Sequence, residues 1–348
     1  MQLYKRSKLV NDEINRVHHN YLPLVILGII VFIIPLFITN PAIIHLFILI
    51  YWFAYLSSSW NIIGGFGGQL SFAHAVFTAL GAYTSSVLFI YYGISPWLGM
   101  LMGGLLAIGV SILIGLPTFR LRGAYFALAT IAVGSTFQTL LTMVDKIGNI
   151  RLWGAQGLIL PIKGDSWMAF QFRSKVPYYY IILIMFISII FISWLIKTSK
   201  MGYYLRAIAQ DEDAAKALGV NPAKYKLLAF IISGFFAALG GTFYAQLQLY
   251  IEPSDIASLQ LAIQLILISI IGGKGSLTGP LIGTLIYVPL SELTRMYLSG
   301  SPIAGIDMVV LGATVVIVIL FQPMGIRVFL NKWISNIFFK HKKIEILS

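Results

Sequence analysis

Residues 202–226 read GYYLRAIAQDEDAAKALGVNPAKYK and stand between long apolar segments of the chain. Asp211 is placed to cap a short helix whose first turn is acidic. Gly219 followed by Asn221-Pro222 ends that helix. The stretch therefore predicts a short helix, a glycine turn and a second, basic helix. We interpret it as a docking surface for another protein, and the alternative is an ordinary solvated loop.

Outside this stretch the chain has the composition of a membrane protein. Of 348 residues, 58% are hydrophobic and only 10% are charged, and the mean hydropathy is +0.87. A soluble domain carries about 25% charged residues. The net charge of +12 fits cytoplasmic loops rich in Lys and Arg better than a nucleic-acid partner. We expect an all-α, polytopic transmembrane helical bundle in the cytoplasmic membrane of the cell. The absence of cysteine excludes disulfides and thiolate metal ligands.

Apolar runs of roughly 16–24 residues recur about ten times. They lie at 21–39, 42–59, 64–91, 97–117, 124–143, 178–196, 227–250, 259–271, 280–298 and 306–321. The run at 259–271 is short, so it starts earlier, tilts or lies inside the protein. The first run lacks a small-residue cleavage site and is interpreted as a retained helix. The chain thus divides into a cytoplasmic N-terminal arm (1–20), a transmembrane domain (21–325) and a basic cytoplasmic tail (326–348).

The distribution of Lys and Arg predicts which loops are cytoplasmic. With the N-terminus inside, most of the 24 Lys and Arg residues fall on the cytoplasmic side. The cytoplasmic segments are then 60–63, 118–123, 197–226, 272–279 and 322–348. The positive-inside rule favours this orientation, with both termini inside and the loop 144–177 outside. The aromatic residues of the outer loop suit either the headgroup level or a docking partner, and the tail suits anchoring at the membrane surface.

Four segments resemble the permease family of bacterial and archaeal ABC importers for branched-chain amino acids, a family with a urea branch. They are WNIIGGFGGQLSFAHAVFTALGAY (60–83), FRLRGAYFALATIA (119–132), the stretch 202–245 and IGGKGSLTGPLIGTL (271–285). Together they spread over most of residues 45–325. One outer segment differs, because LWGAQGL (152–158) stands where the family commonly has Thr-Gly-Gly before Gly-Leu or Gly-Ile. That difference concerns the substrate more than the fold.

The resemblance implies a membrane subunit of an ATP-driven importer. Its partners would be a second related permease subunit, two cytoplasmic ATPase subunits and an extracellular solute-binding protein that delivers Leu, Ile or Val. Urea, a short amide or another amino acid is the alternative substrate. The loop 197–226 would couple the permease to the ATPases. The residues expected to carry this coupling are Gly202, Arg206, Asp211, Glu212, Ala215, Gly219 and Lys226.

Two glycine-rich segments are candidates for the solute pathway. Four glycines in five residues at 64–68 oppose a regular helix. Unpaired backbone at membrane depth is tolerated only inside protein or along a water-filled cavity, as in the broken helices of transporters. The segment GGKGS (272–276) is similar, and close helix packing is the alternative explanation for both. The candidate pathway residues are Asn61, Gly64, Gly67, Gly68, Gln69, Ser71, His74, Gly272, Gly273 and Gly275.

Motifs for ATP hydrolysis and for a catalytic metal are absent from the sequence. GGKGS lacks the spacing of a phosphate-binding loop, and no HExxH or Cys/His cluster occurs. We therefore expect no enzyme activity, cofactor or metal in this chain, with ATP hydrolysed by the partner subunits. Glu292 and Arg295, three residues apart on one helix, suit an ion pair better than a proton relay. The rival hypotheses are a secondary transporter or channel acting alone and a membrane enzyme using His74 with Glu292, and neither explains residues 202–226.

Overall fold

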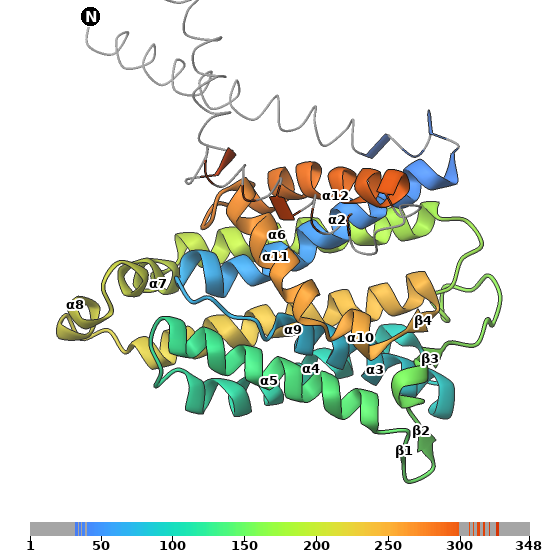
Figure 1. The fold of residues 1–348 in the computed structure, drawn as a ribbon, viewed down its shortest axis with the longest axis horizontal. Coiled ribbons are helices and arrows are strands. Elements are labelled where there is room, and N and C mark those ends of the chain that lie inside the picture. Colours follow the sequence, from blue (N-terminus) through green and yellow to red (C-terminus); the bar gives the residue numbers. More distant parts are fainter. Residues whose placement is uncertain are drawn as a thin grey trace, which may run out of the picture.

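The computed structural model describes residues 40–298 without a break, together with single positions within 32–38 and 306–326. The predicted spans at 21–39 and 306–321, the N-terminal arm and the tail lie outside the continuously described part. Long helices run side by side along one direction, and short elements gather at the two ends of the bundle (Figure 1). The predominantly helical membrane protein expected from the composition is confirmed.

The long helices are α2 (Pro41–Asn61), α3 (His74–Tyr92), α4 (Pro96–Thr118), α5 (Ala124–Met143), α6 (Val176–Thr198), α9 (Pro222–Gln248), α11 (Leu259–Gly272) and α12 (Gly279–Leu298). The short helices are η1 (Ile62–Phe66), η2 (Gly154–Gln156), α7 (Lys200–Gln210), α8 (Glu212–Ala217) and α10 (Pro253–Ile256). The strands are β1 (Lys146–Ile147), β2 (Ile150–Arg151), β3 (Leu158–Ile159) and β4 (Tyr250–Ile251).

Within the described residues, 7 helical segments are long and apolar enough to cross a membrane. They are Pro41–Phe66, His74–Tyr92, Pro96–Thr118, Ala124–Met143, Val176–Thr198, Pro222–Gln248 and Pro253–Gly272. Helix α12 has 20 residues but a more polar second half, with Glu292 and Arg295. The count of about ten spans stays a prediction, because two of those spans lie outside the described part.

One helix boundary differs from the sequence-based prediction. Helix α3 begins at His74 rather than near residue 64, because Ile62–Phe66 extend α2 as a π-helical turn and the chain then leaves helical geometry. Gly68 has a φ of +68° there, which glycine adopts without strain. The short span predicted at 259–271 starts earlier, since the membrane-spanning segment begins at Pro253 with α10. A broken helix that faces a solute stays a prediction.

Helices α3 and α9 pack with their backbones in contact. A Cβ atom at Gly81 would lie 1.8 Å from the carbonyl oxygen of Ala238, and one at Gly241 would lie 1.8 Å from that of Thr78. Thr242 Oγ1 donates a hydrogen bond of 3.0 Å to the Gly81 carbonyl. Small residues that let helices approach this closely are the usual means of helix association in membranes. The crossing therefore depends on glycine at these positions.

Helix α2 is tied to the opposite side of α9 by side-chain hydrogen bonds to backbone carbonyls. Trp52 Nε1 donates to the Gly240 carbonyl over 2.9 Å, and the Tyr55 hydroxyl donates to the Phe236 carbonyl over 2.8 Å. Both aromatic side chains are buried. Buried polar groups must find partners, and these bonds satisfy them while fixing the rotation of α2 against α9.

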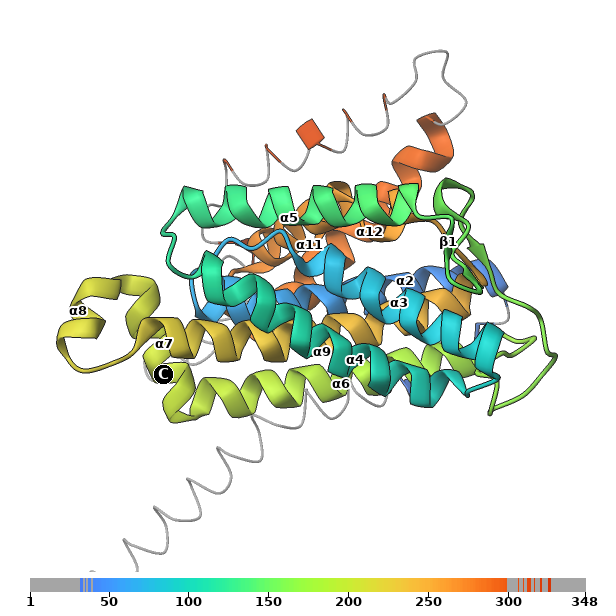
Figure 2. The same cartoon turned by 90° about the horizontal axis from the view of Figure 1, so that it is seen from below.

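Different short elements lie at the two ends of the bundle. At one end α7 and α8 project beyond the long helices, near the loop between α4 and α5 (Figure 2). At the other end β3 pairs antiparallel with β4, with Leu158 opposite Ile251 and Ile159 opposite Tyr250. This pairing joins the loop after α5 to the segment that follows α9. The loops assigned to opposite sides of the membrane thus lie at opposite ends of the bundle.

Candidate functional site

Helices α7 and α8 together form a projection from the bundle, and a helix cap at Asp211 joins them. Asp211 Oδ1 accepts hydrogen bonds of 2.9 Å from the backbone N–H groups of Asp213 and Ala214. These two donors belong to the first turn of α8, where a helix has no internal acceptors. The predicted cap is confirmed, and it fixes the angle between α7 and α8.

The end of α8 follows the predicted glycine turn. Gly219 has a φ of +84°, its N–H donates to the Lys216 carbonyl, and the N–H of Val220 donates to that of Ala215. These two bonds form a Schellman motif. Helix α9 starts at once, with Asn221 as its N-cap and Pro222 at its first position. The projection is therefore a rigid, closely capped turn between two helices.

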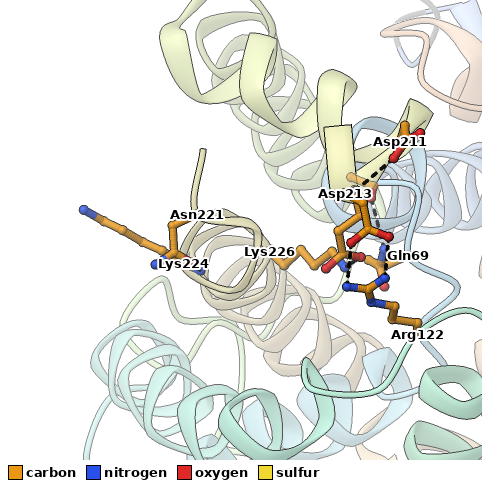
Figure 3. A network of polar contacts seen from close by, with 9 residues as sticks. Gln69, Arg122, Asp211, Asp213, Asn221, Lys224 and Lys226 are labelled. Carbon is orange, nitrogen blue, oxygen red and sulfur yellow. Dashed lines mark hydrogen bonds and ion pairs between the residues drawn. The ribbon is translucent and has the colours of Figure 1, made fainter. Parts of the chain in front are cut away.

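An ion pair attaches the projection to the loop between α4 and α5. The Arg122 guanidinium makes two hydrogen bonds to the Asp213 carboxylate, of 2.8 and 2.9 Å (Figure 3). Hydrogen bonding to this guanidinium lowers the pKa of Asp213 from its usual value. Both side chains are exposed, so water and salt weaken the pair. The geometry orients α8 more than it stabilises the fold.

A second ion pair attaches the projection to α9. Lys226 Nζ lies 2.5 Å from Glu212 Oε2, and the Lys226 side chain is fully buried. Removing one partner of a buried pair leaves an uncompensated charge, which is strongly destabilising. We expected Lys226 at the coupling surface, but its buried side chain is not accessible to an incoming protein. It holds Glu212, and with it α8, in place.

The remaining residues predicted for coupling fall into two groups. Gly202 permits a close turn after α6, because a Cβ there would lie 2.2 Å from the Ile196 carbonyl oxygen. Ala215 lies on the buried face of α8. Arg206 donates from Nε to the Gly202 carbonyl over 3.2 Å and stacks 4.7 Å from the ring centre of Tyr203. The predicted residues left on the surface are Arg206, Asp211 and Gly219.

Leu218 is a surface residue that sequence reasoning missed. Its side chain is 85% exposed at the end of α8. Single exposed apolar residues are common on proteins, so it is the position of Leu218 next to the charged helix α8 that makes it a candidate contact residue. The available signal was a single large apolar residue directly before the glycine that ends a charged helix.

The two glycine-rich segments lie against each other. Asn61 Nδ2 donates to the Ser276 carbonyl, and Asn61 Oδ1 accepts from the Gly275 N–H, each over 2.9 Å. A Cβ at Gly65 would lie 1.9 Å from Asn61 Oδ1. At Gly272 a Cβ would lie 1.7 Å from a backbone oxygen of α12. Close packing is thus observed at Gly65 and Gly272, and a place of these segments on the solute pathway stays a prediction.

The structure separates the other candidate pathway residues. Gly68 lies against α7, where a Cβ atom on it would be 2.9 Å from the Cβ of Ala209. His74 is buried with its ring 5.8 and 6.4 Å from the rings of Phe77 and Phe230, and neither ring nitrogen has a hydrogen-bond partner among the described residues. The remaining positions, all buried or half-buried, are Gly64, Gly67, Gln69, Ser71 and Gly273. The described cavities of the bundle lie elsewhere and contain none of these residues.

A metal site needs several acidic, histidine or cysteine side chains at one place. Among residues 40–298 and the other described positions, no group of three or more His, Cys, Asp or Glu could hold a metal ion. The chemistry available at the projection is recognition by charge and by the apolar Leu218 side chain.

Comparison with known proteins agrees with this architecture. Residues 42–319 match the family model of the permease component of branched-chain amino acid transport systems. The chain is 28% identical to the high-affinity branched-chain amino acid transport permease LivM of Escherichia coli K12, over 76% of this chain and 65% of LivM. It is 25% identical to LivH of Salmonella typhimurium, over 79% of this chain and 90% of LivH.

A shorter match joins the chain to the ribose import permease RbsC of Haemophilus influenzae, with 35% identity over 28% of this chain and 32% of RbsC. No solved structure matches the chain. The alignment thus spans less than two thirds of the LivM relative, while the family model covers most of this chain. The chain belongs to the family of permease components of branched-chain amino acid transport systems.

Proposed function

We propose that this chain is the membrane subunit of an ATP-driven importer that moves branched-chain amino acids delivered by a solute-binding protein. The observation that carries the proposal is the projection formed by α7 and α8. Asp211 caps α8 within it, and Leu218 is exposed at the end of α8. The projection fits a groove on a cytoplasmic ATPase, because it presents an apolar anchor within a charged rim. The permease itself makes and breaks no covalent bond.

The same contacts suggest how ATP hydrolysis acts on the helices. Movement of the bound ATPases would push on α8, which is fixed to α9 through Lys226 and to the loop before α5 through Arg122. Both attachments are short and oriented, so α8 cannot shift without these elements. Rigid helices would then convert the push into alternating access to the solute from the two sides of the membrane.

A second related permease subunit is the proposed partner within the membrane, and α5 supports it. Only 17% of the membrane window of α5 is buried, against 44–61% in the other six candidate spans. The middle of its exposed face carries Ala132, Ser135, Thr136 and Thr139. The large apolar side chains that α5 exposes, such as Leu128 and Leu140, lie toward its two ends, whereas α4 and α6 expose such side chains along most of their length. Small and hydroxyl-bearing residues suit helix–helix contact in a membrane.

Reconstitution tests the proposed function. Liposomes containing the chain, a paired permease and two ATPases should import L-leucine only when ATP and loaded binding protein are present. Urea uptake in the same vesicles tests the alternative substrate. Leucine uptake by the chain alone, driven by an ion gradient and indifferent to ATP, would establish the secondary transporter and refute this proposal.

Cysteine labelling tests the orientation, since the native chain contains no cysteine. We expect Ile162→Cys, 78% exposed in the loop after α5, to react with an impermeant maleimide from outside the cell. Lys224→Cys, exposed at the start of α9, should react only after the membrane is opened. Both variants are to be expressed without the ATPases so that no partner covers α9. The reverse pattern would overturn the positive-inside assignment.

Replacing His74 tests for proton coupling. We expect His74→Gln to keep at least about half of wild-type transport between pH 6 and 8, because the ring is buried among phenylalanines without a hydrogen-bond partner. Uptake of radiolabelled leucine, normalised to the amount of assembled complex, measures the effect. Complete loss of transport with normal assembly would favour a proton-coupled mechanism.

A further inference from the structure

A polar cavity opens at the end of the bundle opposite to α8. It has a volume of about 400 Å³ and lies between the first half of α2, the start of α11, the last turns of α9 and α12, and α10. Small-molecule sites typically occupy roughly 300–1,000 Å³. The cavity is therefore large enough for a small solute, and it faces the side on which β3 and β4 lie.

Charged groups of both signs meet in this cavity. Glu292 and Arg295 come from α12 and Asp255 comes from α10. Charged groups of opposite sign that line one cavity can bind a ligand that carries both charges. The carboxylates can receive an ammonium group, while the guanidinium can receive a carboxylate.

The ion pair on α12 is loose. Arg295 Nη1 and Glu292 Oε1 are 3.9 Å apart, and the Arg295 side chain is 70% exposed. This distance is too long for a hydrogen bond. A guanidinium held this weakly can turn toward a ligand carboxylate and bind it through two parallel N–H groups.

One wall of the cavity is aromatic, and Asp255 lies beside it, because the Tyr244 hydroxyl donates a hydrogen bond of 3.3 Å to Asp255 Oδ2. The rings of Trp52 and Tyr244 are stacked with centroids 4.5 Å apart, and Phe53 packs edge-on against Trp52 at 4.8 Å. The hydrogen bond from Trp52 Nε1 to the Gly240 carbonyl fixes this wall. A smaller hollow of about 80 Å³ shares Trp52, Phe53, Tyr244 and Asp255 with the cavity, and its lining adds both apolar Leu261 and polar Ser258. The cavity thus offers aromatic rings to an apolar side chain next to its charged groups.

We propose that this cavity binds a free amino acid with an apolar side chain. Arg295 holds the α-carboxylate, Glu292 and Asp255 receive the α-ammonium, and the Trp52 wall covers the side chain. The site rests on the proposed function, because it names the substrate class and where that substrate is held. It also places part of the solute selection in the permease, away from the glycine-rich segments at the other end.

Direct binding tests the site. The full-length chain in lipid nanodiscs, without the binding protein, should bind radiolabelled L-leucine saturably. Unlabelled L-valine should compete, whereas 4-methylpentanoate, which lacks the ammonium, and 3-methylbutylamine, which lacks the carboxylate, should not. Arg295→Gln and Glu292→Gln should each weaken leucine binding about tenfold or more, since each removes a charged hydrogen-bond partner.

Arg173→Gln is the matched control, because Arg173 is exposed in the loop before α6 and outside the cavity; it should bind leucine like the wild type. Equal thermal stability of the variants in the nanodisc shows that they fold. Absent leucine binding, or wild-type affinity in Arg295→Gln, overturns the site even if the assembled transporter imports leucine with ATP. If 4-methylpentanoate and 3-methylbutylamine compete as well as L-valine, the site does not require both charged groups of an amino acid, and the proposed binding mode is overturned. Failure of the wild-type transporter to import with ATP refutes the proposed function separately.

Discussion

Replacing Leu218 by Asp is expected to abolish ATP-driven transport while the permease still inserts and pairs in the membrane. The side chain is 85% exposed, so its loss costs the isolated subunit little stability. A hot-spot residue at a protein interface contributes about 2 kcal/mol or more, and a buried unpaired carboxylate in place of Leu218 adds a further penalty. Co-purification of the ATPases with the permease should therefore fall at least about tenfold.

Ile162→Asp is the matched control, because Ile162 is an apolar residue of similar exposure, 78%, at the other end of the bundle. It should leave ATPase co-purification unchanged. Exchanging the charges of Arg122 and Asp213 should retain coupling better than either single reversal, since the swapped pair can still orient α8. Normal ATPase binding by Leu218→Asp would remove the end of α8 from the docking surface.

Replacing Gly241 by Val is expected to prevent assembly of the folded permease. Even the first carbon of a side chain there would lie 1.8 Å from the Thr78 carbonyl oxygen, and backbone cannot move aside as a flexible side chain can. Overpacking in a tight core costs about 1–3 kcal/mol or more, and separating α3 from α9 also breaks the bond from Thr242 to Gly81. The yield of monodisperse protein in detergent and its thermal midpoint measure the effect.

Gly109→Val provides the comparison, because Gly109 lies on α4 with open space where its side chain would be. It should reduce the yield far less than Gly241→Val, although both add the same β-branched residue to a helix. Equal losses in the two variants would show that helix propensity, rather than the contact between α3 and α9, sets the requirement for glycine.

The sequence predicted best what depends on neighbouring residues. The cap at Asp211, the glycine turn at Gly219 and the start of α9 at Pro222 all follow local rules, and all three are found. The start of α3 was placed about ten residues too early, because an apolar, glycine-rich run looks alike whether it continues a helix or leaves one. Only the contact of that run with residues near Gly275 decides between the two.

Predictions that depend on tertiary contacts were less complete. Lys226 and Arg206 look alike in the sequence, yet one is buried against Glu212 and the other stacks on a surface tyrosine. Glu292 and Arg295 were predicted as an ion pair along one helix, and Glu292 also appeared with His74 in the rival enzyme hypothesis. Their relation to Asp255 and to the Trp52 wall required the arrangement of four helices, which no local pattern contains.

Helix α9 runs unbroken from Lys226, which is paired with α8, to Gln248, just before the strand pairing of β4 with β3. Its 27 residues form a rod about 40 Å long. If such a rod tilts by about 5° around one end, the other end is displaced by roughly 3.5 Å. Because β3 is hydrogen-bonded to β4, the loop after α5 would be carried along. A tilt of α9 too small to disturb the packing around α8 would thus displace the loop after α5, at the opposite membrane surface, by more than the length of a carbon–carbon bond.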